Sequence, residues 1–171
     1  MRIDRAWAMP SAWTFTIKPI ANLLQDEGAV GLMKQGVWVD PFAGMNSPAD
    51  ITNDLNPKAN AQYHLDAIDF AIQLDGMYDG VLFDPPYSYR QISEHYREAG
   101  IKASSLDTSS NFYNRVMNAL ADKIKKGGKA ISFGWCSNGF GKNRGFEIVR
   151  ILLVAHGGHH NDTICTVERK L

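Results

Sequence analysis

The run Asp84-Pro85-Pro86-Tyr87 combines residue types that suit chemistry on an aromatic amine. The nitrogen of such an amine is a poor nucleophile because its lone pair is delocalised into the ring. A carboxylate such as Asp84 can accept one N–H bond, and the carbonyl of Pro85 the other, which favours a tetrahedral nitrogen. Two consecutive prolines restrict the backbone that aims this carbonyl, and Tyr87 offers a face for an unstacked base. An ordinary proline turn after the apolar run Val81-Leu82-Phe83 is the alternative.

A second loop of this kind stands earlier in the chain. Gly36-Val37-Trp38-Val39-Asp40 predicts a buried strand, and Pro41-Phe42-Ala43-Gly44 follows it directly. A glycine turn at a strand end is a weak signal alone, because such turns close many α/β units. The two loops together, 44 positions apart from Asp40 to Asp84, form a much stronger pattern.

The pair resembles the motifs of the amino-methyltransferases, S-adenosylmethionine-dependent enzymes that methylate adenine N6 or cytosine N4. In that family an Asp-Pro-Phe-x-Gly cofactor motif follows the first strand, and an Asp/Ser/Asn-Pro-Pro-Tyr/Phe catalytic motif follows the fourth. The resemblance implies catalytic roles for Asp84, Pro85, Pro86 and Tyr87. It implies S-adenosylmethionine contacts from Asp40, Pro41, Phe42, Ala43 and Gly44. The Asp-Pro-Pro-Tyr form is more typical of adenine enzymes, so the predicted activity is methylation of adenine N6 in DNA.

The same resemblance implies further cofactor residues. An acid that ends the second strand binds the ribose hydroxyls in this family, and Asp54 fits that position, with an ordinary turn acid as the alternative. Asp66 precedes the apolar-periodic segment 67–74, where it suits an N-cap and also matches the acid that contacts the cofactor adenine. Phe15 and Lys18 are weaker matches to the segment that packs over the methionine moiety.

The first crossover departs from the family pattern. Only nine residues, Met45 to Asn53, separate Gly44 from Asp54, so no regular helix of about ten residues fits there. We therefore expect a loop over residues 45–49.

The remaining pattern fills an α/β architecture. Apolar residues at helical spacing predict a helix over 111–126 that Gly127-Gly128 would stop. Further strands are predicted over 129–133, 146–155 and 163–169, the last two joined by a hairpin loop over 156–162. The expected fold is a Rossmann-like class I methyltransferase fold, with a mainly parallel seven-stranded sheet and a C-terminal antiparallel strand. The loop histidines predict no metal site; they are His156, His159 and His160.

Composition is ordinary for a compact enzyme. The 171 residues are 44% apolar and 21% charged, which predicts one globular domain. Together with the resemblance, this implies a single methyltransferase domain over 1–171 with no separate target-recognition domain. No membrane-length apolar stretch or signal-like start occurs, and Cys136 and Cys165 have no metal-ligand spacing. These features favour a cytoplasmic location. The sequence lacks the Pro-Cys loop of C5 methylation, a Walker loop and a nucleophile elbow.

Charge is divided unevenly although the net charge is zero. Residues 1–87 hold 5 Lys and Arg against 11 Asp and Glu, or −6; residues 88–171 hold 13 against 7, or +6. Bases that could bind phosphates are Arg90, Arg97, Lys102, Arg115, Lys142 and Arg144. Four other lysines would instead solvate a helix end; they are Lys123, Lys125, Lys126 and Lys129.

The expected partner is nucleic acid, with DNA ahead of RNA. Only Ser88–Asn111 and Gly134–Gly145 are left to touch a substrate, so a homodimer mate or another protein would supply target recognition. Three alternatives stay open: methylation of a base amine in RNA, methylation of cytosine N4, and a catalytically silent nucleic-acid-binding module of the same fold.

Overall fold

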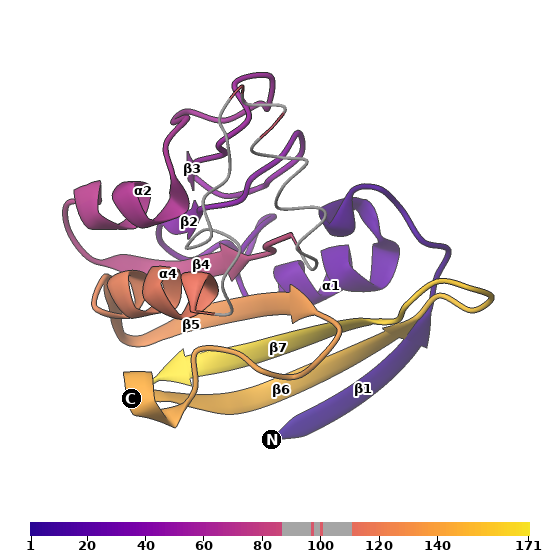
Figure 1. Cartoon of the computed structure of the whole chain (residues 1–171). Coiled ribbons are helices and arrows are strands. Elements are labelled where there is room, and N and C mark those ends of the chain that lie inside the picture. The colour runs from indigo at the N-terminus through magenta and orange to yellow at the C-terminus, as the bar shows by residue number, and fades with distance from the viewer. Residues whose placement is uncertain (87–96, 98–99, 101–110) are drawn as a thin grey trace.

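The computed structural model describes residues 1–86, 97, 100 and 111–171. In this part of the chain, seven strands form one sheet in the order β1-β6-β7-β5-β4-β2-β3 (Figure 1). The strands are β1 (Arg2–Trp7), β2 (Trp38–Asp40), β3 (Ile51–Thr52), β4 (Tyr78–Phe83), β5 (Ile124–Gly134), β6 (Phe146–Ala155) and β7 (Thr163–Lys170). The helices are α1 (Lys18–Asp26), α2 (Ala67–Gln73) and α4 (Phe112–Ala121), with short 3-10 turns η1 (Thr14–Thr16) and η2 (Lys142–Arg144).

Strand direction brings the loops of interest to one edge of the sheet. β2 pairs in parallel with β3 and β4, β4 with β5, and β1 with β6. β7 lies antiparallel between β5 and β6. The carboxyl ends of the parallel strands therefore meet at one edge, which is where open α/β sheets bind ligands. The predicted Rossmann-like fold, with its antiparallel C-terminal strand, is confirmed.

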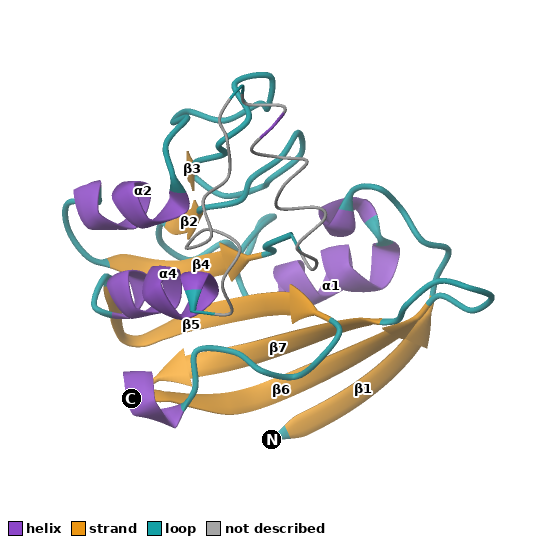
Figure 2. Cartoon of the chain, viewed as in Figure 1, coloured by secondary structure: helices purple, strands orange, loops and turns teal. Residues whose placement is uncertain are grey.

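Helices cover both faces of the sheet (Figure 2). Val81 and Leu82 are successive residues of β4, so their side chains point to opposite faces. Val81 belongs to the core under α2 and α4, and Leu82 to the core under α1. Both side chains are fully buried, and burial of such a side chain contributes about 1.5–3 kcal/mol. Core packing on both faces of the sheet therefore fixes the position of β4.

Two strands differ from the sequence prediction. β1 was not predicted; it is an edge strand whose residues are all exposed or half-buried, with charges on both faces at Arg2, Asp4 and Arg5, so it lacks the apolar alternation of a covered strand. In the family that the motifs resemble, the acid matched by Asp66 follows a third strand; here Tyr63 forms only an isolated bridge with Asn53. The count of seven strands is therefore reached with β1.

The connection from β2 to β3 is a loop, as predicted. No helix lies between Gly44 and Asp54. Asp50 closes the connection, because its carboxylate accepts the Trp38 N–H at 2.8 Å.

The region after α4 corrects the prediction of a longer helix. α4 ends at Ala121 and β5 begins at Ile124, so Gly127-Gly128 lies inside a strand. Gly127 has φ +80°, and the β4–β5 register shifts nearby, which is typical of an irregular strand pair.

Three of the four lysines of this region form specific contacts, while Lys126 is exposed. The Lys123 ammonium donates to the Leu74 carbonyl, Lys125 pairs with Asp79, and Lys129 pairs with Glu27.

The connection from β5 to β6 is held by a buried carboxylate. Glu168 of β7 is fully buried, and it accepts the backbone N–H groups of Phe140 at 2.6 Å and Gly141 at 2.8 Å. A Cβ atom at Gly139 would lie 2.0 Å from a Glu168 oxygen, so only glycine fits there. The Phe140 ring then packs against Phe83, with ring centroids 5.6 Å apart.

The predicted hairpin between β6 and β7 is confirmed. His156 is buried at its start, where Nδ1 lies 2.9 Å from the Ala8 carbonyl and Nε2 lies 2.9 Å from the Thr163 hydroxyl. This histidine therefore ties the hairpin to the segment that follows β1.

Among the helices that the structure describes, none has the length and apolar character needed to cross a bilayer.

Candidate active site

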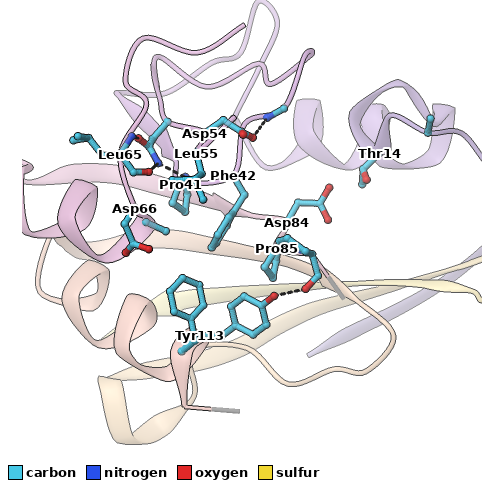
Figure 3. Close-up of a pocket in the computed structure, with 16 residues that line it drawn as sticks. Thr14, Pro41, Phe42, Asp54, Leu55, Leu65, Asp66, Asp84, Pro85 and Tyr113 are labelled. Atoms are coloured by element: carbon cyan, nitrogen blue, oxygen red, sulfur yellow. Dashed lines mark hydrogen bonds between the residues drawn. The ribbon is translucent and has the colours of Figure 1, made fainter. Parts of the chain in front are cut away.

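A cavity of about 250 Å³ lies at the carboxyl edge of the sheet (Figure 3). Ligand sites typically measure about 300–1,000 Å³, so this cavity is slightly smaller than that range. It is lined by Ala12, Thr14, Pro41, Phe42, Gly44, Asn53, Asp54, Leu55, Leu65, Asp66, Ala67, Asp84, Pro85, Pro86, Phe112 and Tyr113. The loops after β2 and β4, predicted separately from two motifs, therefore share one cavity.

The cavity carries negative charge. Asp54, Asp66 and Asp84 line it, and no lysine or arginine is among the described lining residues. Carboxylates close to a low-dielectric wall interact more strongly than in water. The resulting field favours a cationic ligand and disfavours a phosphate.

Asp40 lies beneath the first loop and does not line the cavity. It is fully buried, and its carboxylate accepts the Phe42 N–H at 2.8 Å and the Ser47 hydroxyl at 2.6 Å. Burial raises the pKa of Asp40 to about 7, and the nearby charges of Asp84 and Asp54 act in the same direction while the two hydrogen bonds oppose them. Asp40 therefore holds the backbone of the loop after β2 through its hydrogen bonds to Phe42 and Ser47.

Asp54 closes the glycine turn. One carboxylate oxygen accepts the Gly44 N–H at 2.8 Å, and the other accepts the Asn56 N–H at 2.8 Å. Gly44 has φ +55°, in the left-handed region that favours glycine. A carboxylate has about four acceptor positions, so Asp54 keeps acceptor capacity for hydroxyl groups in the cavity.

Asp66 caps α2, as predicted. Its carboxylate accepts the Ile68 N–H at 2.9 Å. Because Asp66 also lines the cavity, the capping position and the predicted ligand-facing position are occupied by one side chain.

Asn53 is a site residue that the sequence prediction missed. Its amide nitrogen donates to the Leu65 carbonyl at 3.0 Å and to the Pro41 carbonyl at 3.2 Å, and its oxygen accepts the Leu65 N–H at 2.9 Å. This buried amide joins the first loop to the segment before Asp66. The signal in the sequence that could have identified Asn53 was its position as a polar residue at the end of a buried strand.

The second loop is tied to α4. The Tyr113 hydroxyl donates to the Pro86 carbonyl, and the Tyr113 ring packs edge-on against Phe42 and Phe83. Phe42 and Phe83 also contact each other, with centroids 5.4 Å apart. These three rings connect the two loops. Tyr113 was not predicted, and Tyr87 lies outside the described residues.

The two N-terminal candidates lie apart from the cavity lining. Phe15 packs edge-on against Phe133, with ring centroids 5.4 Å apart, and Lys18 is exposed at the start of α1. Ala12 and Thr14 line the cavity instead. In Figure 3 the Asp84 carboxylate points toward Thr14, while Asp66 lies on the other side of the cavity.

Solved structures of methyltransferases share the fold of this chain. The N-methyltransferase NodS from Bradyrhizobium japonicum WM9 has a TM-score of 0.61 at 8% identity, over 90% of this chain and 94% of NodS. TrmN from Thermus thermophilus has a TM-score of 0.59 at 17% identity, over 91% of this chain and 49% of TrmN. The chain thus spans about half the length of TrmN.

A third structure contains bound ligands. The 1,6-didemethyltoxoflavin-N1-methyltransferase from Burkholderia thailandensis, solved with 1,6-didemethyltoxoflavin and S-adenosylhomocysteine, has a TM-score of 0.58 at 12% identity, over 90% of this chain and 77% of that one. No protein-family model and no curated protein sequence matches the chain. The structural likeness shows the class I methyltransferase fold.

Proposed function

We propose that the chain is an S-adenosylmethionine-dependent methyltransferase that acts on the N6 amine of adenine in DNA. One observation carries the proposal: residues of two motifs, whose first aspartates are 44 positions apart in sequence, line a single acid-rich cavity at the carboxyl edge of the sheet. NodS and the Burkholderia enzyme, which share the fold, are named for transfer to nitrogen. Those names support a nitrogen acceptor here.

The charge of the cavity suits this cofactor. S-adenosylmethionine has a sulfonium and an ammonium group against one carboxylate, so it is a net cation. Asp54 would accept the ribose hydroxyls, and Asp66 would contact the adenine amine. Phe42 and Gly44 would contact the cofactor from the first loop, whose path is set by Pro41, Ala43 and the buried Asp40.

When bound, S-adenosylmethionine supplies a methyl group on positively charged sulfur. The second loop prepares the acceptor: Asp84 and the Pro85 carbonyl each accept one N–H bond of the amine, which frees its lone pair from the ring. Tyr87 stacks the base, and Pro86, held by Tyr113, keeps the loop rigid. The proton lost from nitrogen passes to solvent, because the carboxylate is not a lasting proton store. No covalent enzyme intermediate is required.

The choice of adenine rests on the form of the motif, and the choice of DNA over RNA rests only on the preference of the family that the motif resembles. Asp at position 84 favours adenine over cytosine N4, and the related RNA base amines are the second choice of substrate. A homodimer mate or a protein partner would supply target recognition.

The reaction is tested by labelling. Wild type, Asp84→Ala and the control Asp122→Ala are each incubated with DNA or RNA and with S-adenosylmethionine that carries a radioactive methyl group. The nucleic acid is then digested, and its nucleosides are separated. We expect N6-methyladenine from DNA with wild type and the control, and none with Asp84→Ala. Label only in RNA would move the substrate to RNA, and equal label with Asp84→Ala would refute the role of Asp84.

The cofactor site is tested separately by calorimetry with S-adenosylmethionine and S-adenosylhomocysteine. Loss of the hydroxyl contacts in Asp54→Ala is expected to cost about 1–3 kcal/mol of binding free energy, while Asp122→Ala binds as wild type does. The acid-rich cavity further predicts that the cationic S-adenosylmethionine binds more tightly than its uncharged-sulfur product. Absence of binding by wild type would favour the catalytically silent module.

A further inference from the structure

The segment from Ser11 to Lys18 presents an exposed tryptophan beside the cavity. Ala12 and Thr14 both line the cavity, while Trp13 between them has 52% of its surface exposed. Trp13 is thus flanked in sequence by two residues that line the cavity. One of them, Thr14, lies on the side of the cavity toward which the Asp84 carboxylate points (Figure 3).

The backbone around this tryptophan is fixed. The Trp13 carbonyl accepts the Thr16 hydroxyl at 2.8 Å and the Thr16 N–H at 3.0 Å, and the Trp13 N–H donates to Ser11 Oγ at 3.1 Å. Phe15 and Ile17 anchor the same segment in the core under α1. The segment is thus pre-organised, so a ligand that stacks on Trp13 would not have to order the backbone first.

Lys18 is a cation at the end of the same segment, outside the cavity lining. It is exposed and forms no ion pair with any described residue. Lys18 is also the first residue of α1, where the positive end of the helix dipole disfavours a cation. Helix stability therefore does not explain a lysine at this position.

We propose that Trp13 and Lys18 form the binding site for the nucleotide next to the target nucleotide. In this arrangement, which rests on the proposed function, a flanking base stacks on Trp13 and its phosphate contacts Lys18. The two residues are five positions apart, so their Cα atoms are less than about 18 Å apart, and the long, flexible lysine side chain shortens the gap to the phosphate of a base stacked on Trp13. Stacking needs an unpaired base, so the preferred substrate is a single strand or a locally opened duplex.

The experiment measures binding of 12-residue adenine oligonucleotides, as DNA and as RNA, by fluorescence anisotropy and by tryptophan quenching, without added cofactor. Wild type is compared with Trp13→Phe, Trp13→Ala and the control Trp7→Phe, which alters another exposed tryptophan at the end of the edge strand β1. We expect quenching to persist in Trp7→Phe and to change in both Trp13 variants. Trp13→Ala should weaken binding roughly 5- to 100-fold.

Lys18 is tested through the salt dependence of the same binding. Lys18→Gln should lower the slope of log affinity against log salt concentration by about 0.7, the value for one phosphate contact on a single strand. The control Lys126→Gln, an exposed lysine near the amino end of β5, should leave the slope unchanged.

Three results would overturn the site: unchanged affinity in Trp13→Ala, equal quenching by an abasic strand, or no oligonucleotide binding by wild type. If S-adenosylmethionine binds and labels DNA but Trp13→Ala behaves as wild type, this site fails and the proposed function stands. If Trp13-dependent binding occurs without any cofactor binding, the site stands and the methyltransferase proposal fails. Circular dichroism of each variant establishes that the comparison is between folded proteins.

Discussion

Asp40→Asn should change how folding stability depends on pH, because the Asp40 carboxyl group is fully buried beneath the loop that follows β2. The pKa of Asp40 is raised from 3.8 to about 7 in the folded protein, chiefly by burial. Between these values the folded state holds a proton that the unfolded chain releases, so the stability contributed by this group falls as pH rises. Each pKa unit corresponds to about 1.36 kcal/mol, so the loss of folding stability due to Asp40 reaches on the order of 4 kcal/mol above pH 7.

An asparagine at position 40 keeps the acceptor for Phe42 and can donate to Ser47, but it does not ionise. We therefore expect the stability of the variant relative to wild type to increase from pH 4 to pH 7 and then to level off. Urea unfolding at several pH values between about 4 and 8 measures this difference.

Asp79→Asn is the control for that series. Its Lys125 partner lowers the pKa of Asp79, so its stabilising contribution is present above pH 4 and is lost only as pH falls through the lowered value. The Asp79→Asn difference should therefore stay nearly flat across the same range. A flat difference for Asp40→Asn as well would refute the idea that burial controls its ionisation.

Three further substitutions test other parts of the structure. Glu168→Gln removes the charge that accepts two backbone N–H groups and should lower the free energy of unfolding by about 1–3 kcal/mol in urea, whereas Glu147→Gln, in an exposed ion pair, should cost less than about 1 kcal/mol. Tyr113→Phe leaves the Pro86 carbonyl without its donor; it should lower kcat for methyl transfer with little change in KM, and an unchanged kcat would contradict the positioning role. Thr166→Val removes a buried hydroxyl that has no hydrogen-bond partner among the described atoms, so the thermal midpoint should rise, and a lower midpoint would show that the hydroxyl is satisfied.

The sequence predicted the parts of the site that depend on short motifs. Asp54, Asp66 and Asp84 each follow or precede a recognisable local pattern, and all three line the cavity. Asn53 and Tyr113 were missed because their roles depend on partners far along the chain. Tyr113, for example, binds a carbonyl 27 residues earlier.

Long-range pairing also explains the errors in the fold. β1 carries charged residues on both faces, and its ion pair from Asp4 to Arg150 spans 146 positions, so no local pattern could reveal it. A glycine pair such as 127–128 commonly ends a helix. Here Ile124 pairs with Tyr78 of β4 and Lys125 forms an ion pair with Asp79, so the segment before the glycines belongs to a strand. In each case a tertiary contact outweighed the local preference.

The position of β7 has a consequence for the order of folding. Its eight residues, Thr163–Lys170, separate β5 from β6, so each of those strands has an unpaired edge until this segment has been synthesised. β1 also has to wait, because β6 is its only strand partner in the part of the chain that the structure describes. Unpaired apolar edges invite association with other chains. We therefore expect nascent chains that end before residue 163 to bind chaperones or aggregate, and the β1-β6-β7 half of the sheet to form late and cooperatively.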